Sequence, residues 1–132
     1  MDLIRKALEV AIKAHKGVVG KDGLDYVFHP ITVALECNTS DEKVVALLHD
    51  VIEDTPMTLD DLRKEGFPDY IVEAVDAITR RKPAESNGAA RWKYIERCKA
   101  NAIARVVKIA DLEHNGDLSR IQNPTEKMKR RI

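Results

Sequence analysis

The sequence has little of several features that define common functional classes. Only two of its 132 residues are cysteines, Cys37 and Cys98, and they do not form a Cys-x-x-Cys pair. This argues against a zinc knuckle or a thioredoxin-like motif, and we expect both thiols to be reduced and buried. Lysine plus arginine number 22 and so do aspartate plus glutamate, which leaves no net charge. A chain with this balance is not expected to have nucleic acid or an anionic membrane as its main partner.

Long apolar runs are also missing. No stretch approaches the roughly 18 residues of a membrane span, and the first residues, MDLIRKALEV, lack the apolar core of a signal peptide. We therefore expect a cytoplasmic protein. Hydrophobic residues still make up 44% of the chain, which suits one folded domain over residues 1–132. No repeat or linker divides it.

The apolar residues recur at helical rather than alternating spacing, which predicts an all-α fold. Proline and glycine divide the helices. Pro30 suits the first position of one helix, and another, running through residues 46–55, is expected to end before Pro56. The glycine-rich segment 16–28, KGVVGKDGLDYVF, carries turn signals that are compatible with a small hairpin near residues 18–28.

The stretch ALLHDVIEDTP, from Ala46 to Pro56, combines apolar residues with ionisable ones. A helix through this stretch places its ionisable side chains on one contiguous arc: His49, Asp50, Glu53 and Asp54. One interpretation is an amphipathic helix whose acidic side faces water. However, the preceding residues are all apolar, and burying charges without a partner is unfavourable. A divalent metal can be that partner, because it takes anionic oxygen and neutral imidazole ligands.

Adjacent residues such as His49 and Asp50 cannot complete a metal site. The remaining candidates are His29, at the start of the second predicted helix, and Asp111, which ends the apolar run AIARVVKIAD. Two imidazoles and two carboxylates suit manganese, iron or zinc better than calcium. Glu53 and Asp54 are then available for proton or water chemistry.

Three segments match a known set of motifs in the same order along the chain: AHKGVVGKDGLDYVFHPITVA (14–34), LLHDVIEDTPMTLDDL (47–62) and VKIADLEHN (107–115). They resemble the hydrolase domain of the Rel/SpoT alarmone enzymes, within the HD superfamily of metal-dependent phosphohydrolases. The chain length is similar to that of the stand-alone small alarmone hydrolases. The resemblance covers about Ala7 to Ile121. It implies a compact multi-helix HD-domain fold that holds a single divalent metal, manganese.

The resemblance also implies a reaction and the residues that perform it. The reaction removes the 3′-pyrophosphate from guanosine tetra- or pentaphosphate, giving GDP or GTP and pyrophosphate. Matched by motif, the metal ligands are His29, His49, Asp50 and Asp111. Glu53 and Asp54 match the catalytic pair that orients or deprotonates the attacking water. Lys21 and Asn115 match residues that contact the phosphates and the nucleotide.

Two alternatives remain open. Gly20 and Leu112 stand where the family usually carries basic residues, which favours a less charged substrate such as a nucleoside monophosphate or an NADPH-like cofactor. The other alternative is a nucleotide-sensing module without turnover.

We interpret His114 as a supporting or surface residue, Arg80 as a cation at a helix end and Tyr94 as a packing residue. The metal's identity and the oligomeric state are left undetermined.

Overall fold

The computed structural model describes residues 2–81, 85 and 88–116, and within this part of the chain the regular elements are helices without strands. The prediction of an all-α fold is confirmed. The helices are α1 (Leu3–Ala14), α2 (Phe28–Glu36), α3 (Ser40–Leu48), α4 (Val51–Asp54), α5 (Leu59–Lys64), α6 (Asp69–Ile78), α7 (Gly88–Ala100) and α8 (Ala102–Asn115). In the described part, no helix has the length and apolar character that crossing a bilayer requires.

Hydrogen bonds between residues close in sequence set several helix ends. Thr39 and Glu42 form a capping box at the start of α3, and Thr58 and Asp61 form another at the start of α5. Gly66 follows α5 with a φ of 101°, a backbone conformation that suits glycine. These boundaries depend only on local chemistry.

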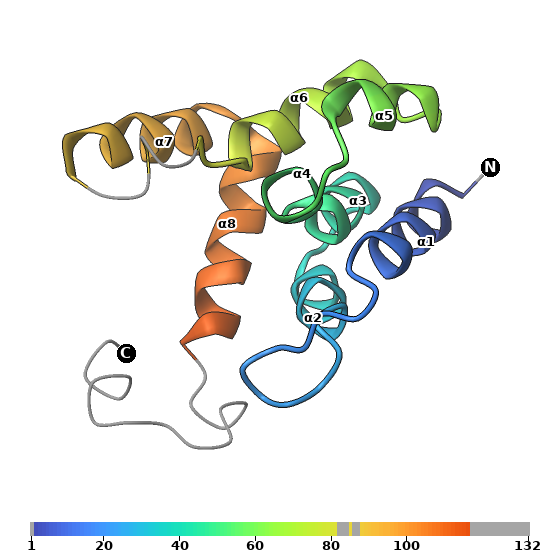
Figure 1. The fold of residues 1–132 in the computed structure, drawn as a ribbon. Helices are drawn as coiled ribbons and strands as arrows, with labels where there is room; N and C mark the ends of the chain where they lie inside the picture. The colour runs from blue at the N-terminus through green and yellow to red at the C-terminus, as the bar shows by residue number, and fades with distance from the viewer. Residues whose placement is uncertain (1, 82–84, 86–87, 117–132) are drawn as a thin grey trace.

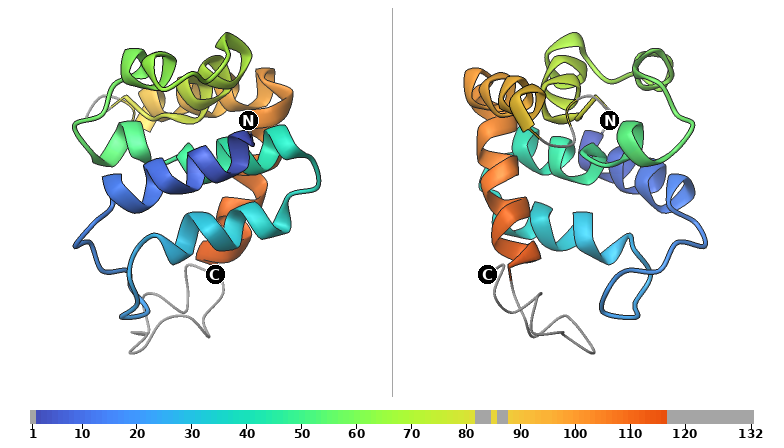
Figure 2. Two further views of the ribbon diagram at one scale, coloured as in Figure 1. Left: turned by 90° about the vertical axis from the view of Figure 1, so that its right-hand side faces the viewer. Right: turned by 60° about the vertical axis from the view of Figure 1, so that its left-hand side comes forward.

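Helix α3 lies at the centre of the molecule. It packs against α1, α2, α6 and α8, and its residues 44–48 are all buried. Helix α8 crosses one side of α2 and α3 at a steep angle, and its beginning lies next to α6 and α7 (Figures 1 and 2). This crossing brings the last turns of α8 next to the first turn of α2 and the end of α3.

The prediction of one continuous helix through residues 46–55 is wrong. Helix α3 ends at Leu48 and α4 begins at Val51, with a turn between them. The carbonyl of Ala46 accepts a hydrogen bond from the backbone N–H of His49 at 3.4 Å and also lies against Nδ1 of the His49 ring. A side chain that competes for a helical carbonyl in this way disturbs the regular ladder. His49 and Asp50 therefore occupy a junction between helices rather than one helical face.

The loop before α2 is narrow but forms no true hairpin strands. It contains one isolated antiparallel bridge between Val19 and Asp25. The N–H of Gly20 donates to the carbonyl of Leu24 at 2.8 Å, and the N–H of Tyr26 donates to the carbonyl of Val18 at 2.7 Å. The sequence indicated the turn, and the structure reduces the expected hairpin to a single bridge.

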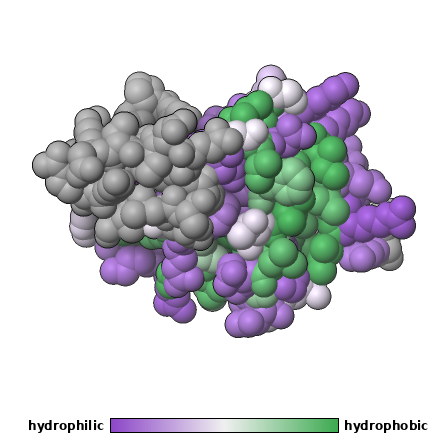
Figure 3. Space-filling view, turned by 90° about the horizontal axis from the view of Figure 1, so that it is seen from below, coloured by the Kyte–Doolittle hydropathy of each residue, from purple (hydrophilic) through white to green (hydrophobic). Residues whose placement is uncertain are grey.

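Large hydrophobic side chains remain exposed on this loop and on α2: Val18, Val19, Leu24, Phe28 and Leu35. Figure 3 views the molecule from the end that carries this loop and shows hydrophobic surface gathered over one part of that face. None of these five side chains lines the pocket described below.

A buried carboxylate ties the segment after α6 to α7. Glu85, 7% exposed, accepts hydrogen bonds from the guanidinium of Arg97 at 2.9 and 3.0 Å and from the backbone N–H of Arg81 at 2.9 Å. Arg97 also donates to the carbonyl of Thr79 at 2.8 Å. The hydrogen bonds from Arg97, followed by that from Arg81, lower the pKa of Glu85 to about 2.

We expect Glu85→Gln to destabilise the protein at neutral pH, lowering the melting temperature by about 5 °C, because a charged hydrogen-bond network is lost. Because the pKa of Glu85 is lower in the folded protein, its ionised carboxylate stabilises the fold above the unfolded-state pKa near 4.5. This contribution is lost as the pH falls towards about 2. The difference between wild type and variant should therefore shrink over that range. Thermal melts at several pH values test this, with the exposed Glu73→Gln as control. A difference that does not change with pH would contradict the assigned network.

Candidate metal centre

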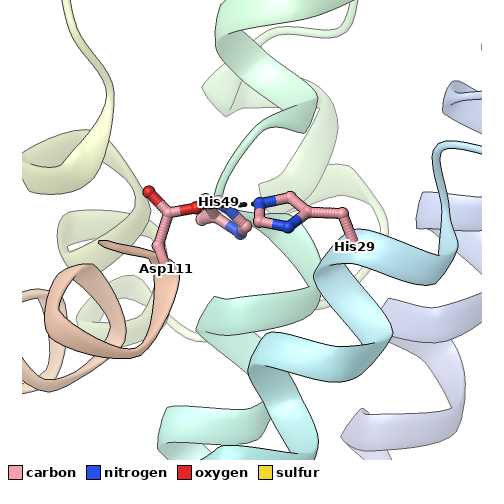
Figure 4. A group of neighbouring side chains, drawn as sticks. All are labelled: His29, His49 and Asp111. Carbon is pink, nitrogen blue, oxygen red and sulfur yellow. Dashed lines mark hydrogen bonds and ion pairs between the residues drawn. The ribbon is translucent and has the colours of Figure 1, made fainter. Parts of the chain in front are cut away.

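The four predicted metal ligands come from three separate parts of the chain. His29 lies in the first turn of α2, His49 and Asp50 lie at the α3–α4 junction, and Asp111 lies near the end of α8. Figure 4 shows the side chains of His29, His49 and Asp111 pointing toward one another from three elements. One ligand atom from each of these three lies within 4.8 Å of the others. Packing of α8 across α2 and α3 creates this convergence.

Both carboxylates face both imidazoles. The Asp111 Oδ1 atom lies 2.8 Å from Nε2 of His29 and 3.2 Å from Nε2 of His49. The Asp50 Oδ2 atom lies 3.1 Å from Nε2 of His49 and 3.8 Å from Nε2 of His29. His29, His49 and Asp111 are each at most 6% exposed. A buried set of imidazole nitrogens and carboxylate oxygens fits a divalent transition metal, so this group can hold one.

The other nitrogen of each imidazole is occupied by the protein. Nδ1 of His49 faces the carbonyl of Ala46, and Nδ1 of His29 lies 2.7 Å from Nδ1 of His114. In both rings Nε2 is the nitrogen that faces the carboxylates. This division is typical of metal-binding histidines, whose second nitrogen hydrogen-bonds to the protein. His114 therefore contacts the candidate ligand His29 through the ring nitrogen that faces away from the carboxylates.

The pKa values of His49, Asp50 and Asp111 are shifted by their neighbours. Burial by itself lowers the pKa of His49, but Asp50 and Asp111 outweigh burial and hold it well above the ordinary value of 6.5. Burial by itself raises the pKa values of Asp50 and Asp111. His49 and the Tyr26 hydroxyl nevertheless hold the pKa of Asp50 well below its usual range, and His29 and His49 do the same for Asp111. The two carboxylates favour a positive charge between them, which a metal ion can also supply.

A second acidic group adjoins the first. One carboxylate oxygen from each of Asp50, Glu53 and Asp54 lies within 4.8 Å of the others. Glu53 accepts a hydrogen bond from the backbone N–H of Arg80 at 3.0 Å, and the Arg80 guanidinium lies 3.5 Å from its other oxygen. Asp54 is exposed. The sequence-predicted catalytic pair thus lies beside the candidate metal ligands, with one member held in place and the other open to solvent.

A pocket of about 380 Å³ contains both groups. Lys21 and Asn115, the predicted substrate contacts, both line it. The amide nitrogen of Asn115 also donates to Oδ1 of Asp111 at 3.2 Å. The structure therefore brings together all eight residues that the sequence predicted for the site, although their roles stay predictions.

The pocket also contains residues that the sequence analysis did not assign to a site: Tyr26, Arg80, Arg91, Tyr94 and Lys108. The Tyr26 hydroxyl donates to Oδ2 of Asp50, and Lys108 donates to Oδ2 of Asp111 at 3.2 Å. Arg80 and Tyr94 were interpreted as a helix-end cation and a packing residue. Lys108, one turn before Asp111, and Tyr26, three residues before His29, gave local signals. The others approach the pocket through the packing of distant segments.

Comparisons with known proteins identify relatives of this chain in sequence and in fold. No family model matches the sequence. The probable GTP pyrophosphokinase of Mycobacterium leprae is 33% identical over 99% of this chain, and the bifunctional (p)ppGpp synthase/hydrolase SpoT of Escherichia coli K12 is 32% identical over 85% of it. The chain is a homologue of the SpoT/Rel proteins. It spans 17% of the length of each of these two relatives.

A solved structure extends the relationship to the fold. A metazoan ortholog of SpoT, whose reported property is that it hydrolyses ppGpp, superposes with a TM-score of 0.78 and is 26% identical. The match covers 99% of this chain and 79% of that one. The all-helical arrangement described above is therefore that of a SpoT-type protein.

Proposed function

We propose that this protein is a manganese-dependent phosphohydrolase that removes the 3′-pyrophosphate from guanosine tetra- or pentaphosphate, in a single domain over residues 1–132. The observation that carries the proposal is the buried His29, His49 and Asp111 group beside a second carboxylate group in one pocket. The SpoT relatives support the reaction, because the Escherichia coli protein is a (p)ppGpp synthase/hydrolase and the metazoan ortholog hydrolyses ppGpp.

The residues that would hold Mn²⁺ are His29, His49, Asp50 and Asp111. When bound, the metal lowers the pKa of a coordinated water and offsets the charge of a phosphate. Tyr26 keeps Asp50 in place through its hydroxyl. Lys108 and Asn115 hold Asp111 through hydrogen bonds of 3.2 Å each. Imidazole and carboxylate ligands fit Mn²⁺ and also Zn²⁺ or Fe²⁺, and manganese rests on the resemblance to the Rel/SpoT hydrolases.

Glu53 and Asp54 would orient the attacking water and accept its proton. A carboxylate within hydrogen-bond reach of that water can act as a general base. Arg80 restrains Glu53 from both its backbone and its side chain, which suits an orienting role. The exposed Asp54 can pass a proton to solvent. The proton lost by the water then leaves the pocket without crossing the buried group.

The charges that line the pocket favour a highly phosphorylated substrate over a less charged one. Leu112, where the family usually has a basic residue, is 55% exposed and does not line this pocket. Among the described residues, the lining carries four cationic side chains against four carboxylates: Lys21, Arg80, Arg91 and Lys108. A bound metal adds further positive charge. Cations from the segment after α6 and from α7 and α8 therefore replace those that Gly20 and Leu112 do not provide.

A turnover screen tests this function. Purified protein with Mn²⁺ is incubated separately with guanosine tetraphosphate, guanosine pentaphosphate, nucleoside monophosphates and NADPH, and the release of pyrophosphate and of inorganic phosphate is followed. We expect pyrophosphate from the first two only, and none with His49→Ala. Phosphate from a monophosphate or from NADPH without alarmone turnover would replace this proposal with a different phosphohydrolase. Nucleotide binding without any product would indicate a sensing module.

A further inference from the structure

We propose that His114 is a positioning residue that holds His29 in the one tautomer able to bind a metal through Nε2. This inference rests on the metal centre proposed above and assigns a role to a residue outside the predicted ligand set. The observation behind it is the approach of the two rings, which come from helices far apart in the sequence and lie with their Nδ1 atoms 2.7 Å apart.

The two rings meet edge to edge. Their planes differ by 13° and their centroids are 4.9 Å apart. That separation is the Nδ1–Nδ1 distance of 2.7 Å plus about one ring radius at each end. The two nitrogens therefore lie close to the line between the ring centres and close to a common plane. An imidazole N–H and an imidazole lone pair both point in this plane, so the contact has the geometry of an N–H···N hydrogen bond.

The role of each nitrogen follows from the metal. A neutral imidazole carries a proton on one nitrogen and a lone pair on the other. If Nε2 of His29 gives its lone pair to a metal, Nδ1 must carry the proton, and it needs an acceptor. The Nδ1 atom of His114 is that acceptor. An outer acceptor of this kind fixes both the tautomer and the orientation of the ring.

The other histidine of the centre shows the same arrangement with a different acceptor. Nδ1 of His49 faces the backbone carbonyl of Ala46, which can only accept a hydrogen bond. His29 lies in the first turn of α2, and its Nδ1 faces α8 instead. There it meets a side chain one turn from the candidate ligand Asp111. The last turns of α8 thus supply one ligand and the support for another.

Two isosteric variants test the role. In His114→Asn the Oδ1 atom takes the place of Nδ1 and keeps an acceptor, whereas His114→Leu puts a methyl group there. We expect the leucine variant to bind Mn²⁺ about 10–100-fold more weakly than wild type by isothermal titration calorimetry, and the asparagine variant to stay within about threefold. If His114 had only a structural role, the leucine variant would bind Mn²⁺ more tightly than the asparagine variant, because leucine is the better helix former.

The metal-free melting temperatures of both variants are measured in parallel. Wild-type Mn²⁺ affinity in the leucine variant would overturn the proposal. Equal losses of affinity in both variants, together with equal falls in melting temperature, would also overturn it and give His114 a structural role. Failure of the proposed function would look different: wild type would bind Mn²⁺ with the expected order of variants but release no pyrophosphate from guanosine tetraphosphate.

Discussion

Replacing His49 with alanine is expected to abolish both Mn²⁺ binding and pyrophosphate release. The change removes a candidate ligand nitrogen, which is one of the two imidazole nitrogens that face Asp50 and the buried Asp111. Loss of an outer supporting residue already weakens metal binding by about 10–100-fold, so loss of a ligand should weaken it by at least about 100-fold. Because enzymes accelerate their reactions by about a million-fold or more, turnover should fall by at least about 1,000-fold.

Isothermal titration with Mn²⁺ and a pyrophosphate-release assay measure the two effects. Asp111→Asn is the companion variant, since it keeps the size of the side chain and removes its charge. Circular dichroism of each variant establishes that the helices remain. Wild-type Mn²⁺ affinity in both variants would show that the metal, if one is needed, binds elsewhere.

Replacing Asp54 with asparagine is expected to separate catalysis from metal binding. The side chain is exposed and lies in the second carboxylate group rather than among the buried ligands. Removing a general base typically lowers the rate by about 100- to 10,000-fold. We therefore expect kcat to fall by that factor while the affinity for Mn²⁺ stays within about threefold.

Asp60→Asn is the matched control, because Asp60 is an exposed carboxylate on α5 that does not line the pocket. Steady-state kinetics and Mn²⁺ titration are compared for the two variants. Unchanged turnover in Asp54→Asn would exclude a catalytic role for this carboxylate. A large loss of metal affinity would instead place Asp54 among the metal ligands.

The break between α3 and α4 was not predicted by helical spacing. Periodicity placed His49 and Glu53 on one face of one helix, whereas the structure ends α3 before His49 and starts a new helix at Val51. Placing residues on a helix face by their spacing assumes an uninterrupted series of backbone hydrogen bonds along the helix. A polar side chain that bonds to a carbonyl within its own helix changes that series, and hydrophobic periodicity does not report such a bond.

The sequence by itself determined the all-helical fold, several helix ends and the identity of the candidate ligands. Apolar spacing and capping residues act within a few positions, so they can be recognised locally, and the ordered motifs around His29, His49 and Asp111 indicate a metal-dependent hydrolase. Only the tertiary structure decided which other residues join them. Arg80 and Arg91 reach the pocket, and His114 meets His29, because α6, α7 and α8 cross the central helices at particular angles. Those angles come from packing of side chains along whole helix faces, which no short stretch of sequence encodes.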